Sequence, residues 1–274
     1  DRDMAYETIE VKALTPHVGG EVSGIDLTKP LSNRQVHDLN EALLDRGVIF
    51  FRDQPIDVPT LKRFGQHFGK LHIHSAMKGM SDEHPEVRPL HADATSKHVA
   101  GEEWHTDLSC DPIPPMGSIL HLHTLPTVGG DTIWSNMYKA YEMLSPQMKD
   151  YLENLTAVHD GGLVFRRFNP NGKYNVSTHP VIVKHPVTKK KVIYVNRSYT
   201  SHIVELPAKE SAAVLAFLYN HCEDPLWSVR FTWRQHSIAF WDNRCTQHYA
   251  VWDYFPQTRS GDRVQIEGSN PPWG

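Results

Sequence analysis

Short apolar or alternating runs recur along the chain, and each has the length and composition of a β-strand. Val48-Ile49-Phe50-Phe51 is an unbroken run of β-branched and aromatic residues, as in a strand buried on both faces. Residues 119–125 and 228–234 alternate apolar and polar side chains, which indicates strands with one buried face. The same signals predict strands within residues 8–14, 181–184, 192–196, 238–241 and 263–267.

Helical periodicity appears between these strands and is bounded by capping residues. Ser32, with Gln35 three residues later, has the capping-box pattern, and Gly47 ends the helix that follows. A second helix is predicted from about Val58 to a stop at Gly69. Further helices are predicted over residues 137–144, 146–155 and 207–220.

Two stretches, residues 78–103 and 161–177, show no sustained periodicity. Loops of this length inside a compact domain are usually functional, so both are predicted to be active-site loops, the first of them a lid. We find no repeat, low-complexity tract or linker, and predict a single domain over residues 1–274. The pattern predicts a mainly β fold with flanking helices (α+β), built on a double-sheet jelly-roll core.

Composition narrows the class of protein. The net charge of −4 and the pI near 6.5 provide no basic surface of the kind that nucleic-acid binding requires. No apolar run approaches a membrane span, and the first residues do not form a signal peptide, although the chain does not begin with Met and leaves open whether a leader was removed. Three scattered cysteines are too few for a disulfide framework, which favours a reducing, cytoplasmic setting.

The strongest chemical signal is Trp104-His105-Thr106-Asp107. Residues two positions apart in an extended chain project from the same face, so the imidazole of His105 and the carboxylate of Asp107 can converge on one ion. A downstream stretch ending in His248 supplies a second histidine. Two histidines and one carboxylate with open coordination positions suit a mononuclear non-haem Fe(II) that activates dioxygen, whereas a structural zinc site would require four ligands.

Two arginines near the end of the chain, Arg259 and Arg263, are four residues apart and would face the same side of one strand. A guanidinium can hold a carboxylate through two parallel hydrogen bonds, and 2-oxoglutarate carries two carboxylates. The alternative is that either arginine forms a surface ion pair with Asp253, Asp262 or Glu267.

These motifs, together with others in the same order, resemble the taurine dioxygenase group of Fe(II)/2-oxoglutarate-dependent oxygenases. The resemblance runs from about Val11 to Gly268. Its motifs are Gly24-Ile25-Asp26-Leu27, Phe51-Arg52-Asp53-Gln54, Leu71-His72-Ile73-His74, Trp104-His105-Thr106-Asp107, Gly129-Gly130-Asp131-Thr132, Trp241-Asp242-Asn243-Arg244 and Gln247-His248-Tyr249-Ala250. The resemblance implies a double-stranded β-helix core, bound Fe(II), 2-oxoglutarate as cosubstrate, and O2.

The resemblance also implies roles for single residues. His105, Asp107 and His248 would bind the iron. Arg259 would pair with the distal carboxylate of 2-oxoglutarate, helped by the hydroxyl group of Thr132. Arg263 would lie nearer the metal and contact the cosubstrate or the substrate.

Two further positions belong to the predicted substrate pocket. His74 matches the family position that contacts the anionic group of the substrate, and the alternative is a sheet histidine stacked on His72. Tyr199 keeps an aromatic ring. By contrast, Gly161-Gly162 and Cys110 stand where taurine-cleaving members have aromatic residues, and Gly101 replaces an amide-bearing position. These departures predict a different and roomier pocket, and they disfavour taurine itself.

The predicted function is hydroxylation of an unactivated C–H bond in a small anionic substrate, of the sulfonate, sulfate-ester or aryloxy/alkyl carboxylate type, with decarboxylation of 2-oxoglutarate to succinate. One alternative is biosynthetic hydroxylation of an amino acid or related metabolite by the same machinery. Another is a non-catalytic, cupin-like metal-binding protein, which would not need Arg259 or Thr132. We expect a small-molecule partner, no nucleic-acid or membrane partner, and a homo-oligomer.

Overall fold

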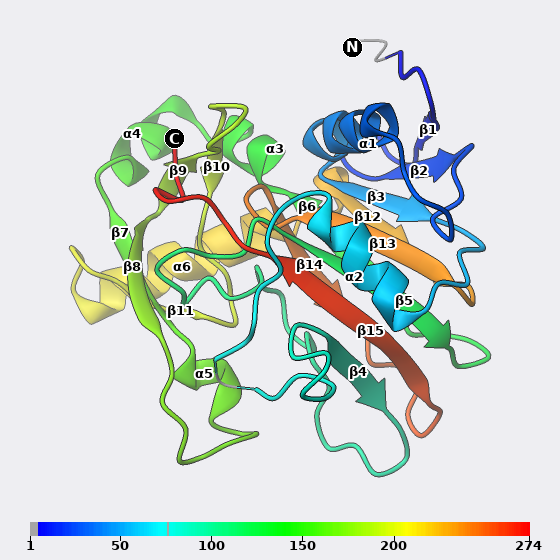
Figure 1. The fold of residues 1–274 in the computed structure, drawn as a ribbon. Coiled ribbons are helices and arrows are strands. Elements are labelled where there is room, and N and C mark those ends of the chain that lie inside the picture. The colour runs from blue at the N-terminus through cyan, green and yellow to red at the C-terminus, as the bar shows by residue number, and fades with distance from the viewer. Residues whose placement is uncertain (1–4, 76) are drawn as a thin grey trace.

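The computed structural model describes residues 5–75 and 77–274, and its architecture is mainly β (Figure 1). A 7-stranded sheet has the order β1-β2-β3-β13-β5-β15-β4, and a 3-stranded sheet has the order β12-β6-β14. The strands of the larger sheet are β1 (Glu10–Ala13), β2 (Gly20–Ser23), β3 (Val48–Phe51), β13 (Ser237–Asp242), β5 (Gly117–Thr124), β15 (Arg259–Ile266) and β4 (Arg88–Ala92). The strands of the smaller sheet are β12 (Ser228–Phe231), β6 (Thr132–Asn136) and β14 (Thr246–Ala250). These two sheets form the predicted jelly-roll core.

Further strands and the helices surround this core (Figure 1). The outlying strands are β7 (Thr156–Asp160), β8 (Val176–Pro180) and β11 (Thr200–Ile203), which form a second 3-stranded sheet, and the hairpin of β9 (Ile182–Lys184) and β10 (Lys191–Ile193). The helices are α1 (Asn33–Arg46), α2 (Val58–Gln66), α3 (Met137–Glu142), α4 (Pro146–Leu152), α5 (Gly162–Phe165), α6 (Ala208–Cys222) and the 3-10 helix η1 (Pro225–Trp227). Among the described residues, no helix is long and apolar enough to cross a membrane.

The two core sheets face each other across a hydrophobic cluster. Phe50 of β3 stacks on Phe231 of β12 with 3.9 Å between ring centroids. Trp134 of β6 and Trp241 of β13 meet with their centroids 5.5 Å apart. Because successive side chains of a strand point to opposite faces, the other face of the large sheet needs separate cover.

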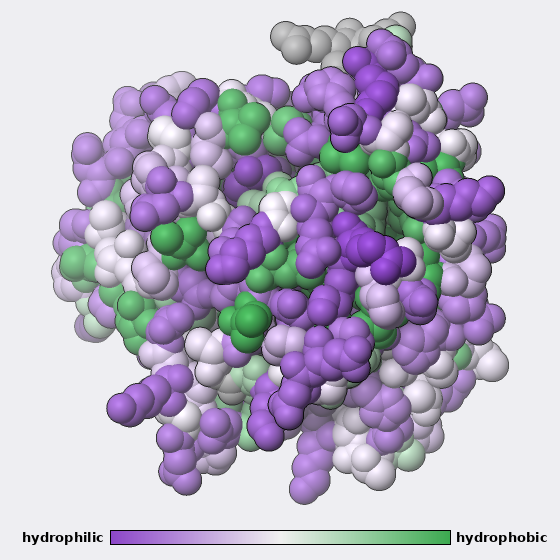
Figure 2. All heavy atoms as spheres, in the orientation of Figure 1, coloured by the Kyte–Doolittle hydropathy of each residue, from purple (hydrophilic) through white to green (hydrophobic). Residues whose placement is uncertain are grey.

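Helices α1 and α2 provide this cover. Ile49 and Phe51 of β3 pack in one buried cluster with Leu39 and Leu43 of α1 and Phe64 of α2. All of β3 is therefore buried, as its unbroken apolar run predicts. The helices turn their polar sides outward, and polar side chains cover most of this face of the molecule (Figure 2).

The ends of α1 follow the predicted capping pattern. Gln35 N donates to Ser32 Oγ at 3.1 Å, and Ser32 N donates to Gln35 Oε1 at 2.8 Å. Gly47 has a φ of 72°, a conformation that glycine adopts without steric cost, and it ends the helix. Helix α2 ends at Gln66 rather than at the predicted stop, Gly69.

Two elements lie inside the stretches that were expected to be irregular. Strand β4 occupies Arg88–Ala92 at the edge of the large sheet, and α5 is a single turn at Gly162–Phe165. Local signals for both are weak: β4 contains Pro89, which only an edge strand tolerates, and one turn is too short to show periodicity. The closing strand β15 begins at Arg259, four residues before the predicted start.

A buried carboxylate attaches the N-terminal segment to α1. Oδ2 of Asp38 accepts hydrogen bonds from Glu7 N, Thr8 N and Thr8 Oγ1 at 3.0, 2.8 and 2.7 Å, and Oδ1 lies 3.3 Å from Arg34 Nε. Burial raises the pKa of Asp38, but these hydrogen bonds and the charge of Arg34 outweigh burial, so the pKa is lower than usual.

Asp38→Asn is expected to lower the free energy of unfolding by about 1.5–3 kcal/mol near neutral pH, the usual contribution of hydrogen bonds to a charged group. Since the folded-state pKa lies below the ordinary 3.8, the stabilisation is present above that value and is lost as the pH falls through the folded-state pKa. Urea unfolding at neutral and strongly acidic pH should show the difference from the unmodified protein shrinking in acid. Asp45→Asn, on the exposed side of α1, is the control, and equal effects of the two substitutions would contradict the assignment.

Candidate active site

The predicted metal ligands lie together in the fold. His105 N donates to His248 O at 3.0 Å and His248 N donates to His105 O at 2.9 Å, so a β-bridge joins β14 to the segment that carries Asp107. Nε2 of His105 and Nε2 of His248 lie 3.2 and 3.4 Å from the same atom, Asp107 Oδ1. All three side chains are buried. Within the described residues, no further His, Cys, Asp or Glu joins this group.

Hydrogen bonds to the remaining polar atoms orient these ligands. His105 Nδ1 donates to the carbonyl oxygen of Glu103 at 2.8 Å, so Nε2 is the ring nitrogen that faces Asp107. Asp107 Oδ2 accepts from Ser118 Oγ at 2.6 Å, and Ser118 accepts from Asn243 Nδ2 at 3.0 Å. Oδ1 is therefore the carboxylate oxygen that faces the two imidazoles.

The electrostatics of this group favour a bound cation. Burial, with His105 close by, lowers the pKa of His248 to about 3, so its ring is neutral near pH 7. Burial opposes ionisation of Asp107, yet the adjacent His248, Arg263 and His105 hold the pKa of Asp107 well below its ordinary value. A carboxylate oxygen and two imidazole nitrogens thus converge at a buried position. This donor set, with two imidazoles and one carboxylate, fits Fe(II).

Arg259 lies buried between β15 and β6. Its Nη2 donates to Thr132 Oγ1 at 3.2 Å and its Nε donates to the carbonyl oxygen of Gly130 at 3.1 Å. Both partners are neutral, and burial lowers the pKa of Arg259 below its ordinary value. Among the described residues it forms no ion pair, so the predicted alternative of a surface salt bridge is wrong for this arginine. A buried guanidinium with neutral partners calls for an anionic ligand.

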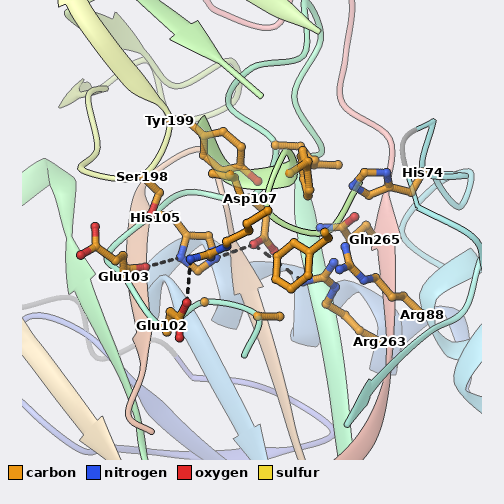
Figure 3. A pocket seen from close by; sticks show the side chains of 17 residues that line it. His74, Arg88, Glu102, Glu103, His105, Asp107, Ser198, Tyr199, Arg263 and Gln265 are labelled. Carbon is orange, nitrogen blue, oxygen red and sulfur yellow. Dashed lines mark hydrogen bonds and ion pairs between the residues drawn. The ribbon is translucent and has the colours of Figure 1, made fainter. Parts of the chain in front are cut away.

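A cavity lies directly beside Asp107 (Figure 3). Arg263 Nη1 is 4.0 Å from Asp107 Oδ1, and Arg263 lines the cavity together with His74 and Tyr199. The structure thus brings the three predicted substrate residues to one place beside the predicted metal ligands.

The protonation state of His74 can be assigned from its contacts. Burial, with Arg88 and Arg263 nearby, lowers the pKa of His74 to about 3, so the ring is neutral near pH 7. Its Nδ1 accepts the backbone N–H of Met77 at 3.1 Å. The proton of the neutral ring is therefore on Nε2, which makes that atom a hydrogen-bond donor.

Among the cavity residues that sequence reasoning did not single out are Arg88, Phe165 and Gln265. Gln265 is two residues beyond Arg263 on β15, so strand alternation was a signal that points to it. Phe165 belongs to the short helix α5, which has no periodic signature. Arg88 faces the cavity because β4 pairs with β15, and no local pattern predicts that pairing.

The small residues that were expected to enlarge the pocket do not line it. A Cβ atom on Gly161 would meet Cys110 Sγ and Asn175 O, each at 3.1 Å, so these residues pack tightly against one another. The wall of the cavity at this end consists of Val164 and Phe165 of α5. These positions therefore do not widen the cavity directly, and the helix that follows them places the ring of Phe165 in its lining.

Gly101, the other position that differs from the taurine-cleaving members, leaves space for the proposed metal ligand His105. Its φ is +79°, and a Cβ atom there would lie 2.9 Å from His105 Cε1. A side chain at this position would therefore be strained and would displace the imidazole.

The two predicted active-site loops meet over the cavity. Glu102, in residues 78–103, forms an ion pair with Arg167, in residues 161–177, with 2.6 Å between Oε1 and Nη1. The same Glu102 oxygen lies 2.9 Å from His98 Nδ1. Arg167 and Glu102 both line the cavity, so their ion pair joins its two sides.

Glu102→Gln is expected to speed hydrogen exchange of the backbone in residues 162–175 by about two- to fivefold, because a partly exposed ion pair contributes about 0.4–1 kcal/mol. High salt should produce a similar increase in the unmodified protein. Mass-spectrometric exchange measures both effects. Glu142→Gln removes an exposed ion pair with Lys139 elsewhere and is the matched control. Unchanged exchange in the Glu102 variant would contradict the contact.

A second group of potential ligands, His185, Asp242 and Cys245, is also buried. Arg244 Nε and Nη2 donate to the two oxygens of Asp242 at 2.8 and 3.0 Å, and His185 Nε2 lies 2.9 Å from Oδ2. His185 Nδ1 accepts the backbone N–H of Val187 at 3.1 Å. Protein partners already occupy these atoms, so this group is a structural hydrogen-bond network.

The sequence and the structure were compared with those of known proteins. Residues 10–265 match the family described as "Taurine catabolism dioxygenase TauD, TfdA family". A Saccharomyces cerevisiae protein named alpha-ketoglutarate-dependent sulfonate dioxygenase is 34% identical over 96% of this chain and 68% of its own length. An Acinetobacter baylyi protein named alkylsulfatase is 32% identical over 96% of this chain and 86% of its own length. A crystal structure from Burkholderia xenovorans, titled a putative alpha-ketoglutarate-dependent taurine dioxygenase, is 35% identical, has a TM-score of 0.85, and aligns over 95% of this chain and 93% of that one.

Proposed function

Because the chain belongs to the taurine catabolism dioxygenase TauD, TfdA family, we propose that the buried His-Asp-His group holds Fe(II) and that the cavity beside it takes a small anionic substrate. The chain is an Fe(II)/2-oxoglutarate-dependent dioxygenase. In this reaction O2 and 2-oxoglutarate are consumed. One oxygen atom enters a substrate C–H bond as a hydroxyl group, the other enters succinate, and CO2 leaves.

His105, Asp107 and His248 are the proposed iron ligands. Iron bound there supplies the activation of dioxygen that attack on an unactivated C–H bond requires. The residues around it set ligand orientation: the Glu103 carbonyl oxygen fixes the His105 ring, and Ser118 fixes the carboxylate. Three protein ligands leave the other coordination positions for cosubstrate and dioxygen.

Arg259 and Thr132 are the proposed partners of the distal carboxylate of 2-oxoglutarate. What supports this role is a buried guanidinium that, among the described residues, donates hydrogen bonds only to neutral oxygens. A carboxylate bound there would supply the missing charge through a bidentate contact. A non-catalytic metal-binding protein has no use for this arginine, so the observation favours the enzyme over that alternative.

Arg263 and His74 are the proposed contacts of the substrate's anionic group, and Tyr199 lines the same pocket. A guanidinium and an imidazole N–H in surroundings with little water compensate the desolvation of an anion. Val164 and Phe165 form an apolar wall in the same cavity, which suits an alkyl or aryl chain attached to that anion.

Two relatives support a sulfur oxyanion as substrate. The yeast protein is named for sulfonates, and the Acinetobacter protein is named alkylsulfatase. Both substrate types place a charged head group next to an alkyl carbon. Hydroxylation of that carbon gives an unstable product that breaks its C–S or C–O bond and releases the sulfur oxyanion. We therefore propose sulfonates or sulfate esters as substrates, with carboxylates as the competing class.

The convergence of the three ligands beside the arginine-lined cavity is the observation on which this function depends. Its test is succinate formation and O2 uptake by the Fe(II)-loaded enzyme with 2-oxoglutarate, across alkyl sulfonates, sulfate esters, carboxylates and their neutral amide or ester analogues. We expect stimulation by anions only. Equal stimulation by the neutral analogues would remove the anion selectivity and leave the oxygenase activity intact.

A further inference from the structure

Arg88 is a charged residue of the cavity that no motif predicts and no role above uses. It lies on β4 directly opposite Arg263 in the antiparallel pairing with β15. Residues directly opposite each other have Cα atoms about 4.5–5.5 Å apart and side chains on the same face. Both arginines line the cavity, and Figure 3 shows them side by side, on the same side of Asp107 as His74.

Two like charges in directly opposed positions destabilise a sheet unless an anion lies between them. Within the described part of the chain, Arg88 forms no ion pair. The carboxylate of the site is Asp107, and its Oδ1 already lies within 4.0 Å of nitrogen atoms of His105, His248 and Arg263. Burial and the charge of Arg263 lower the pKa of Arg88 to about 10, which leaves the guanidinium charged near pH 7. The protein thus keeps a second, uncompensated cation at this end of the cavity.

We propose that Arg88 is a second guanidinium of the substrate subsite, and that the pair Arg88–Arg263 selects a tetrahedral head group whose three terminal oxygens share the negative charge, a sulfonate or sulfate ester, over a carboxylate. This inference rests on the proposed function and specifies the substrate class of the same site.

The preference for a tetrahedral head group follows from the number and direction of the hydrogen-bond donors. A carboxylate is planar, and one guanidinium fork in its plane uses both of its oxygens. Here Arg88 and Arg263 approach from two neighbouring strands, and His74 contributes an Nε2–H donor from a third segment. Three donor groups from three directions match the three oxygens of a tetrahedral head group better than the two oxygens of a planar one.

Arg88 and Arg259 both line a second cavity, but the strand register places their backbones apart. Arg259 lies opposite Ala92, whereas Arg88 lies opposite Arg263, four residues away along β15. Four residues of a strand span about 13 Å. The backbone therefore positions Arg88 beside Arg263, at the end of the strand away from Arg259.

The test compares Arg88→Ala, Arg88→Gln and Arg88→Lys with the unmodified enzyme. Binding of hexanesulfonate, hexyl sulfate and heptanoate is measured by calorimetry on Mn(II)-loaded enzyme with 2-oxoglutarate in the absence of O2, and KM is measured in turnover with Fe(II). We expect Arg88→Ala and Arg88→Gln to lower the affinity for both sulfur oxyanions about 10- to 100-fold. The affinity for heptanoate should fall much less. The KM for 2-oxoglutarate should stay within about twofold, and Arg88→Lys should restore part of the loss.

Stability provides a second measurement. Because Arg88 and Arg263 repel each other, the Arg88→Gln variant without substrate should unfold at the same or a higher temperature than the unmodified enzyme. Added hexanesulfonate should raise the unfolding temperature of the variant less than that of the unmodified enzyme. Arg63→Ala removes one exposed arginine on α2 and controls for net charge.

The outcomes separate the two levels of inference. If the unmodified enzyme turns over a sulfonate or sulfate ester and the Arg88 variants bind it equally well, the role of Arg88 is overturned and the proposed function stands. A rise in the KM for 2-oxoglutarate alone would move Arg88 to the cosubstrate and overturn the inference as well. If the unmodified enzyme neither binds nor turns over any of these anions, the proposed substrate class fails, and the inference fails with it.

Discussion

Asp107→Ala should abolish turnover and lower Fe(II) affinity by more than about 100-fold, since even residues that only orient a metal ligand contribute 10- to 100-fold to affinity. Asp107 Oδ1 is the one charged donor of the group, and both imidazole Nε2 atoms face it at 3.2 and 3.4 Å. Its removal leaves two imidazole ligands and the positive charge of Arg263, which repels a cation. Anaerobic equilibrium dialysis with Fe(II) measures the loss, with circular dichroism to show that the variant is folded.

Two further variants distinguish the effect of the proposed metal ligand from that of the residue that orients it. Asp107→Asn keeps the shape of the side chain and removes the charge, so it should behave nearly like the alanine variant. Ser118→Ala removes only the 2.6 Å hydrogen bond to Oδ2 and should cost about 10- to 100-fold in affinity. Retention of stoichiometric iron by both Asp107 variants would show that the ligand assignment is incorrect.

Arg259→Ala should weaken 2-oxoglutarate binding by about 2–5 kcal/mol, which corresponds to at least about 30-fold in affinity. The magnitude is large because the guanidinium is buried, so a carboxylate bound beside it would lose its only charged partner and remain desolvated. Iron affinity should change by less than about threefold, because Arg259 contacts none of the proposed metal ligands. Calorimetric titration of Mn(II)-loaded enzyme with 2-oxoglutarate in the absence of O2 measures the effect.

Controls for this variant come from its surroundings. Thr132→Val removes the hydroxyl group that accepts a hydrogen bond from Arg259 at 3.2 Å. It should lower the affinity for 2-oxoglutarate by a smaller factor than Arg259→Ala does. Arg230→Ala removes an exposed arginine of the neighbouring strand β12, which pairs with Asp131, and should leave 2-oxoglutarate binding nearly unchanged. An Arg259 variant with unaltered 2-oxoglutarate affinity would exclude the cosubstrate role.

Much of the fold could be predicted because its signals are local. The capping box at Ser32 and Gln35 depends on residues three positions apart, and the burial of β3 follows from its own composition. The elements that escaped prediction, β4 and α5, are short and lie in segments without periodicity. Their positions depend on partners far away in the chain, β15 for β4 and the contact of Gly161 with Cys110 for α5.

The sequence by itself determined which residue types are available for the chemistry: the His105–Asp107 pair, the distant His248, and the two arginines on one face of β15. These follow from spacing, because i and i+2 or i and i+4 on a strand share a face. Only the tertiary structure decided that Arg88 stands opposite Arg263, that Phe165 lines the cavity, and that Glu102 meets Arg167 across its mouth. The physical reason is that strand register and loop contacts join segments far apart in the chain, and a shift of one residue in register would turn Arg88 to the other face of the sheet.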